Sequence, residues 1–129
     1  MDMQPPADME LTLRTLAMPA DANPAGDIFG GWVMSQMDLA AFVRANEAAG
    51  GRTVTVAVNE IVFKKPVKIG DTLCVYTQIE KIGRTSITLR IEAWTRRHYE
   101  HSREKVTEAR FIMVAVDEDG NPRPVKAEI

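Results

Sequence analysis

The sequence predicts an α+β fold, in which an antiparallel sheet of about five strands wraps around one long central helix. Residues 32–49 contain neither glycine nor proline and begin with an apolar stretch, which is typical of a buried helix. The chain after Gly51 instead shows alternating and β-branched segments that are separated by short turns. Strands that are joined without crossover helices run mostly antiparallel.

Each element is predicted from its local pattern. Glycines at 50 and 51 end the helix as a C-terminal cap would, and the polar residues from Arg44 onward are expected to emerge into solvent. One helix cannot cover both faces of such a sheet, so the remaining face or an edge must meet solvent or a partner chain. In order, the predicted elements are a flexible tail (1–9), a strand (10–17), an irregular segment (18–31), the helix (32–49), strands (53–63, 72–81, 85–97 and 106–116), a polar loop (98–105) and a turn (117–124).

Length and composition limit the function classes. The 129 residues predict one domain over residues 10–124, with a short tail at 125–129. A net charge of −2 argues against a general nucleic-acid binder, and the longest apolar run, Phe111–Val116, is too short to span a membrane. The single cysteine, Cys74, excludes an intrachain disulfide, so we expect a cytoplasmic protein.

Asp38 is the first candidate functional residue. It lies about two turns inside the apolar part of the helix, beyond the first turn in which a carboxylate caps free amides. An isolated carboxylate in such a segment is costly unless it is paired or functional. Pairing with an arginine, exposure to a solvent channel and a catalytic role all remain open.

Two further candidates precede Asp38. Gly30 and Gly31 open the helix, where free backbone amides stabilise an anion or a developing oxyanion, although a plain helix entry gives the same pattern. The side-chain amide of Asn23 can orient a water or a carbonyl, and a turn residue is the alternative.

Cations gather at the ends of the predicted strands. Five such side chains in one cluster would bind phosphates, and a solvated rim is the alternative. They are Lys64, Lys65, Lys68, Lys81 and Arg84. No metal site is expected, because His98 and His101 fall in a polar loop without a third ligand at a recognised spacing. Cys74 is expected to pack, and residues 117–120 are expected to form a turn.

Taken together, these residues resemble the YciA-type acyl-CoA thioesterases of the hotdog superfamily, from about Leu11 to Pro124. The resemblance is carried by residues 13–23, 26–32, 34–38, 63–71 and 114–117. It implies a hotdog fold, a dimer with a continuous sheet, a trimer of dimers, and hydrolysis of acyl-CoA over a broad range of chain lengths. It implies no cofactor other than the coenzyme A of the substrate.

The resemblance also implies residue roles. Asp38 corresponds to the catalytic carboxylate, the amide of Gly30 or Gly31 to the group that polarises the thioester carbonyl, and Asn23 to an asparagine that related enzymes use. The run that includes Arg84, Thr85 and Ser86 matches the place where the family contacts CoA phosphates. Phe42 departs from the small residues that many relatives carry after the catalytic aspartate, which puts the acyl-chain preference in doubt.

Helix geometry adds a constraint. Gly30 and Asp38 are eight residues apart, hence about 12 Å along one helix axis, which is too far for both to reach one carbonyl. We therefore expect an active site shared between two antiparallel helices of a dimer. A hotdog dehydratase and a non-catalytic acyl-CoA-binding module are the alternatives. The dehydratase would need a histidine near the helix start, where Phe29 stands.

Overall fold

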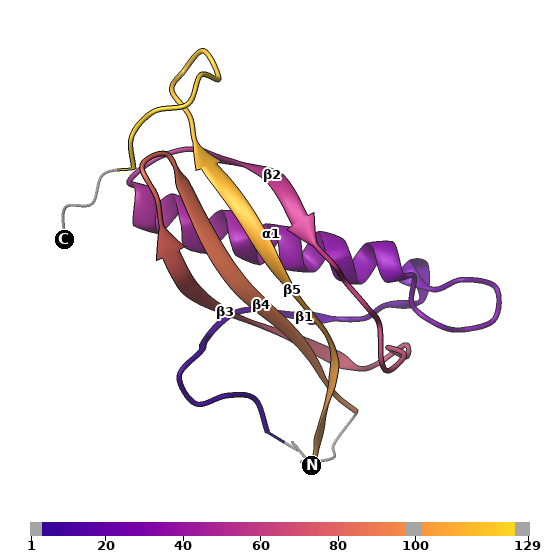
Figure 1. The fold of residues 1–129 in the computed structure, drawn as a ribbon. Helices are drawn as coiled ribbons and strands as arrows, with labels where there is room; N and C mark the ends of the chain where they lie inside the picture. Colours follow the sequence, from indigo (N-terminus) through magenta and orange to yellow (C-terminus); the bar gives the residue numbers. More distant parts are fainter. Residues whose placement is uncertain (1–3, 98–101, 126–129) are drawn as a thin grey trace.

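The computed structural model describes residues 4–97 and 102–125, and these form a five-stranded sheet and one long helix (Figure 1). The elements are β1 (Glu10–Leu16), the 3₁₀ helix η1 (Pro19–Asp21), α1 (Gly30–Ala49), β2 (Thr53–Asn59), β3 (Thr72–Ile82), β4 (Ser86–Arg96) and β5 (Arg103–Ala115). The strand order is β1-β3-β4-β5-β2, and every neighbouring pair is antiparallel. The predicted fold class is confirmed, and β1 and β2 are the edges of the sheet.

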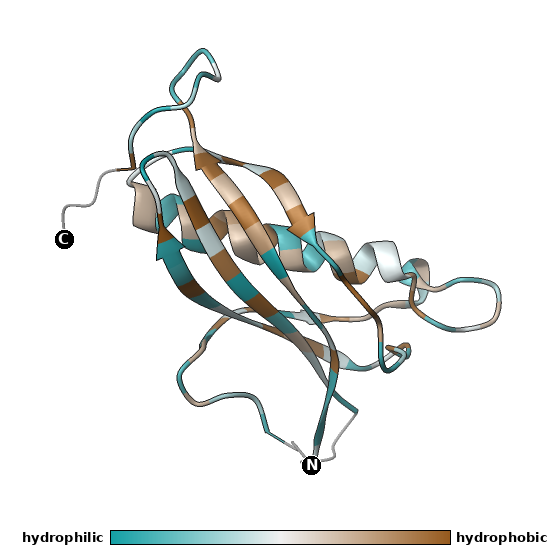
Figure 2. Cartoon of the chain, in the orientation of Figure 1, coloured by the Kyte–Doolittle hydropathy of each residue, from teal (hydrophilic) through white to brown (hydrophobic). Residues whose placement is uncertain are grey.

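Alternation along the strands builds the core. In β4, Ile87, Leu89 and Ile91 are completely buried and belong to the core cluster that also contains the buried face of α1. Figure 2 shows the resulting bands of apolar and polar residues along the central strands. Because successive side chains of a strand point to opposite faces, the polar residues between them lie on the outer face of the sheet.

The helix is buried on one face only. Its inward residues are Val33, Met37, Ala40, Ala41, Ala45 and Ala49. Leu39, Phe42 and Val43, on the other face, are 51%, 45% and 47% exposed. The prediction of a helix buried on all sides is therefore wrong for a single chain, because one sheet covers only one side of a cylinder.

The last turns of α1 emerge into solvent only in part: Glu47 is exposed as predicted, whereas Arg44 and Asn46 are half-buried. Arg44 donates hydrogen bonds to the carbonyl and the hydroxyl of Thr77 on β3, at 3.2 and 2.9 Å. Asn46 accepts hydrogen bonds from the amide and the hydroxyl of Thr53, at 2.9 and 2.6 Å. These polar residues tie the helix to the sheet instead of facing water. Gly50 then ends the helix in the left-handed conformation, with φ of 66°, as the sequence predicts.

Several boundaries differ from the predicted ones. The helix begins at Gly30, as the glycine pair predicts, two residues before the uninterrupted run that starts at Trp32. The strand β2 ends at Asn59 instead of Phe63, and the next residue, Glu60, has a positive φ of 24° that leaves the extended conformation. The strand β5 already starts at Arg103, within the predicted polar loop. Met9 and Val125 are buried, so packed residues extend one position beyond each predicted domain limit.

A small second cluster lies on the outer face of the sheet. It consists of Met9, Cys74, Tyr76 and Trp94, which confirms that Cys74 packs as a small apolar residue. Burial raises the pKa of the Tyr76 hydroxyl, so this group stays protonated at neutral pH. The buried carboxylate of Glu92 beside this cluster accepts hydrogen bonds from Trp94 and Arg90, at 2.9 and 2.6 Å.

Candidate active site

Asp38 lies on the exposed side of α1, where its carboxylate meets β2. The hydroxyl of Thr55 donates a 2.5 Å hydrogen bond to Asp38 Oδ1. Within residues 4–97 and 102–125, Asp38 forms no ion pair. In the single chain Asp38 therefore pairs with no arginine of the described residues, and its side chain is exposed at the groove described below. The carboxylate is held in place by one neutral donor and keeps lone pairs for a water or a substrate.

The hydrogen bond from Thr55 to Asp38 stands in the middle of a groove between α1 and the edge strand β2. One half, which we call the Met34 half, has a volume of about 330 Å³ and is lined by Gly31, Met34, Ser35, Val58 and Phe111 together with the central pair. The other, the Arg52 half, has a volume of about 460 Å³ and is lined by Leu39, Phe42, Arg52, Thr53 and Val54 together with the same pair. The two hollows share Asp38 and Thr55, so they adjoin at this pair.

The glycines at the helix start leave amide groups available. Trp32 and Val33 both donate their amides to the Phe29 carbonyl, at 3.1 and 3.4 Å. The amides of Gly30 and Gly31 precede them, in the first turn, where a helix offers no carbonyl of its own. A Cβ atom on Gly30 would lie 3.4 Å from the ring of Phe63, whereas the space at Gly31 is open and faces the Met34 half. Gly30 therefore allows close packing, and Gly31 allows close approach of a ligand.

The structure places these amides away from Asp38 of the same chain. Eight residues of continuous helix separate Gly30 from Asp38, which is about 12 Å along the axis. Gly31 and Asp38 line the same half of the groove, but one thioester carbonyl cannot contact both Asp38 and the helix-start amides of the same chain.

Asn23 organises a turn. Its side-chain oxygen accepts hydrogen bonds from the amides of Ala25 and Asp27, at 2.9 and 3.1 Å. Its backbone amide donates to the carbonyl of Asp27, at 2.7 Å. The carbonyl end of this side chain is thus occupied, and only its NH₂ group is left to act on a ligand.

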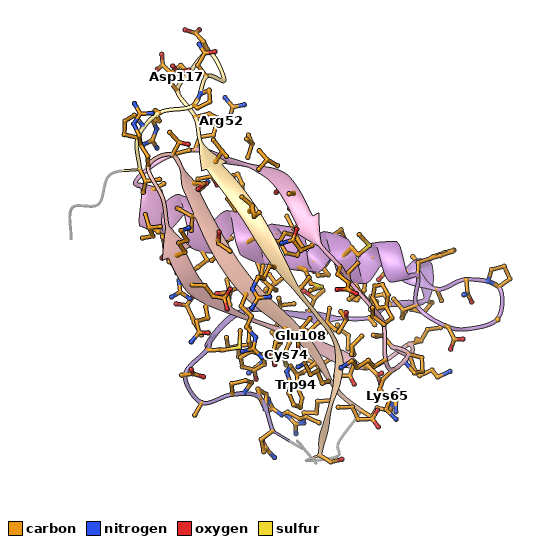
Figure 3. The ribbon with its side chains drawn as sticks, viewed as in Figure 1. Arg52, Lys65, Cys74, Trp94, Glu108 and Asp117 are labelled. Atoms are coloured by element: carbon orange, nitrogen blue, oxygen red, sulfur yellow. The ribbon has the colours of Figure 1, made fainter. Side chains whose placement is uncertain are left out.

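The predicted cluster of cations is divided between two ends of the molecule, so its description as one cluster is wrong for a single chain. Lys64 donates its amide to Val106 and Ala115 donates its amide to Thr85, so the two groups contact β5 at positions nine residues apart. That separation is about 30 Å along a strand. Lys65 accordingly appears at the opposite end of the sheet from Arg52 (Figure 3).

The members of the two groups differ in their partners. Lys64 and Lys65 follow β2, near the start of α1, and Lys68 forms an ion pair with Asp27. Lys81 belongs to the end of β3, and Arg84, Thr85 and Ser86 form the turn into β4 beside the end of α1. A Cβ atom at Gly83 would lie 2.9 Å from the Ser86 hydroxyl, so a larger residue there would displace the Ser86 side chain.

Thr55 is the site residue that sequence reasoning missed. It falls within a predicted strand and looks like any other β-branched strand residue. Only the packing of α1 against β2 brings its hydroxyl to Asp38. Another hollow, on the outer face, is lined by Asn59, Glu60, Arg90, Glu108, Ala109 and Arg110, and its Glu108 carboxylate is paired with Lys105 and Arg90.

Neither a cluster of metal ligands nor a membrane-spanning helix is found in residues 4–97 and 102–125. Across the described parts of the chain, no three His, Cys, Asp or Glu side chains gather where they would hold a metal ion. His98 and His101 lie outside the described residues. In the same parts of the chain, α1 is not apolar enough for its length to cross a membrane, and no other helix is long enough.

Comparison with known proteins identifies the family. The model of the thioesterase superfamily matches residues 25–100. The chain belongs to this superfamily. An acyl-CoA thioester hydrolase, YciA from Salmonella typhimurium, is 52% identical over 122 residues, which cover 92% of each chain. Solved structures agree with this assignment. A hexameric hotdog-fold thioesterase of Campylobacter jejuni is 40% identical and superimposes with a TM-score of 0.84. The match covers 91% of the present chain and 90% of the other.

Two further solved structures bear on the site. The hexameric broad-specificity acyl-coenzyme A thioesterase HI0827, solved with one aspartate replaced by alanine, is 48% identical, with a TM-score of 0.88 and coverage of 92% and 88%. An acyl-CoA hydrolase from Staphylococcus aureus is 25% identical, with a TM-score of 0.80 and coverage of 88% and 69%. That enzyme was solved with an aspartate and, separately, a threonine replaced by alanine, and these two residues are seventeen positions apart. Asp38 and Thr55 have the same separation.

Proposed function

We propose that this protein hydrolyses acyl-CoA thioesters to CoA and a carboxylic acid, over a broad range of acyl chains, with Asp38 as the catalytic carboxylate. The observation that carries the proposal is the position of Asp38, oriented by Thr55 in the middle of an open groove, in a chain of the thioesterase superfamily. A carboxylate is a suitable group for this reaction because it serves as either a base or a nucleophile.

Two routes are compatible with this geometry. In the first, Asp38 takes a proton from a water whose oxygen attacks the thioester carbonyl, the C–S bond breaks, and the proton passes to the departing thiolate. In the second, an Asp38 oxygen attacks the carbonyl and expels the thiolate, and water then hydrolyses the mixed anhydride. In both routes, amides at the start of a helix hold the negative charge on the carbonyl oxygen. The reaction uses water and the substrate's own CoA, so the proposal includes no cofactor.

The proposed active unit is a dimer in which Asp38 of one chain meets the Gly30–Gly31 amides of the other. The support is the separation of about 12 Å within one chain, together with an apolar surface around the groove. This surface consists of Phe29, Met34, Leu39, Phe42, Val43, Val56, Val58, Val62 and Phe63. The exposed valines of β2 lie on an edge strand, which is suited to pairing with the same strand of a second copy. Related enzymes are hexamers, and three such dimers would form one.

The same dimer would reunite the cations. With the helices antiparallel and the start of one beside Asp38 of the other, Lys64 and Lys65 of one chain lie on the side of Asp38 that leads to the Lys81 and Arg84 end of the other. We propose that CoA phosphates bind there, with Thr85 and Ser86 as further donors. A cytoplasmic location is part of the proposal, because the one cysteine of the sequence, Cys74, is free and buried.

A hydrolysis assay with a chromogenic thiol trap and acyl-CoAs of two to sixteen carbons tests the function. Thiol release by the wild-type protein, lost in a folded Asp38→Ala variant, is the expected result. CoA binding without thiol release would instead indicate a binding module, and hydration of enoyl-CoA without thiol release would indicate a dehydratase. Thiol release that is unchanged in Asp38→Ala would reject Asp38 as the catalytic group.

A further inference from the structure

Arg52 is an unused cation at the end of the active-site groove. It is exposed, and its guanidinium makes no ion pair or side-chain hydrogen bond with any residue in 4–97 or 102–125. It lines the Arg52 half of the groove together with Leu39 and Phe42 of α1. An arginine that no carboxylate neutralises, at the end of an apolar groove, is suited to a ligand with an apolar body and an anionic end.

The distance from Asp38 to Arg52 fits one such ligand. Thr55 touches Asp38, and Arg52 stands three residues before Thr55 on an extended chain, about 10 Å away. The arginine side chain adds about 6 Å to this reach. The pantetheine arm of CoA spans thirteen bonds from its sulfur to the first phosphorus, which is about 15 Å when extended. A thioester at Asp38 would thus place the CoA diphosphate at the Arg52 guanidinium.

The sheet places a second unpaired cation beside this position. Val54 pairs with Val114 on β5, and Val114 pairs with Ser86 on β4. Arg52 stands two residues before Val54, and Arg84 stands two residues before Ser86. The two arginines therefore lie at the same end of the sheet. Two strand spacings separate their backbones by about 10 Å. The two guanidinium groups can therefore share one diphosphate and the neighbouring 3′-phosphate.

The Met34 half of the groove has a different character. Met34, Val58 and Phe111 line it, and Asp38, at its inner end, is its only charged lining residue among the described parts of the chain. Such a surface favours an alkyl chain, because burying apolar area is worth about 25 cal/mol per Å².

We propose, on the basis of the thioesterase function above, that Arg52 is a CoA-binding residue and that the two halves of the groove hold different parts of the substrate on either side of Asp38. The pantetheine arm lies in the Arg52 half, with the diphosphate between Arg52 and Arg84, and the acyl chain lies in the Met34 half. Two acidic residues, Asp117 and Glu118, share a separate hollow with Arg52. One oxygen of Asp117 is occupied by the amides of Asp119 and Asn121, so this carboxylate holds its own turn.

The first test measures the CoA end of the substrate. Arg52→Gln should raise KM about tenfold for every acyl-CoA, whatever its chain length, and should weaken inhibition by free CoA by the same factor while changing kcat little. The slope of log KM against log salt concentration should also fall. Arg110→Gln is the matched control, because Arg110 is an exposed arginine on the outer face that pairs with Glu80 at 2.7 Å. It should leave all these quantities unchanged.

The second test measures the acyl end. Met34→Ala should change the ratio of kcat/KM between long and short acyl chains, and should leave inhibition by free CoA unchanged. If Arg52→Gln instead alters chain-length preference while free CoA inhibits as before, the acyl chain lies in the Arg52 half and the proposal is wrong. It is also wrong if Arg52→Gln behaves like Arg110→Gln. Calorimetric binding of free CoA to the wild-type protein and Arg52→Gln tests Arg52 even if no acyl-CoA is hydrolysed, so the two proposals fail separately.

Discussion

Asp38 is the catalytic carboxylate of the proposed function, and its environment predicts the effect of replacing it. The carboxylate is exposed in one chain and touches Thr55, so Asp38→Ala should leave the fold intact. Loss of a general base lowers rates by at least about a hundredfold, and we expect that loss in kcat. Steady-state kinetics together with circular dichroism measure both properties. Near-normal kcat in folded Asp38→Ala would contradict the assignment.

Thr55 should act through Asp38. Thr55→Val keeps the shape of the side chain and removes the donor that orients the carboxylate. A hydrogen bond to a charged group contributes about 1.5–3 kcal/mol, so kcat should fall about tenfold or more, yet less than in Asp38→Ala. Thr55→Ser, which keeps the hydroxyl, should recover most of the rate. Failure of serine to do better than valine would show that the methyl group and not the hydroxyl matters.

Two substitutions at Asn23 separate its part in the turn from the part of its NH₂ group at a ligand. Asn23→Ala removes the acceptor of two amide hydrogen bonds, and it should lower kcat less than Asp38→Ala because orienting a group is a smaller loss than removing the base. Asn23→Asp keeps the acceptor, replaces the NH₂ donor by a second oxygen and adds a negative charge. Comparing kcat and melting temperature of the two variants distinguishes the turn from the donor. A larger loss of kcat in Asn23→Ala than in Asp38→Ala would reverse the assigned roles.

Among the elements, α1 has two faces that contribute differently: the buried face stabilises the fold, and the exposed face is expected to stabilise self-association. Met37 is fully buried against the sheet, whereas Leu39 is 51% exposed in the apolar surface beside the groove. Met37→Ala should therefore cost about 2–5 kcal/mol of folding free energy, as buried large-to-small substitutions do. Leu39→Ala should cost much less in a dilute, dissociated chain and should weaken self-association instead. Denaturant unfolding and sedimentation measure the two effects, and equal unfolding costs would contradict this division.

Local sequence signals predict the elements of this fold but not the contacts between distant segments. The helix, its Gly50 cap, the antiparallel strands and the candidate aspartate were all predictable, because periodicity and turn residues are local signals. The exposed side of α1 was not, since an apolar residue looks the same whether its own sheet or a partner covers it. The contact of Thr55 with Asp38 and the division of the cations between two ends depend on which distant segments meet, and spacing along the chain does not report that.

At the scale of the whole molecule, the charge distribution predicts how binding responds to salt. The overall net charge is −2, so under the proposed function the CoA phosphates would be attracted by local cations such as Arg84. KM should rise with ionic strength through screening. Arg84→Ala should raise KM more than it lowers kcat, because phosphate contacts are similar in the ground and transition states. Initial rates at several salt concentrations measure this, and a KM that is independent of salt would count against the proposed phosphate site.

The assembly carries the central claim, which is that each site takes Asp38 from one chain and the helix-start amides from another. The most direct measurement is complementation between Asp38→Ala and Gly30→Val, each folded and inactive alone, after subunit exchange that mass spectrometry verifies. A shared site predicts one intact site per heterodimer, hence activity that returns to at most about half of the wild-type value per heterodimer. If Asp38 and Gly30 served one site from the same chain, every site would carry a lesion. A mixture that exchanges subunits and stays inactive would contradict the shared active site.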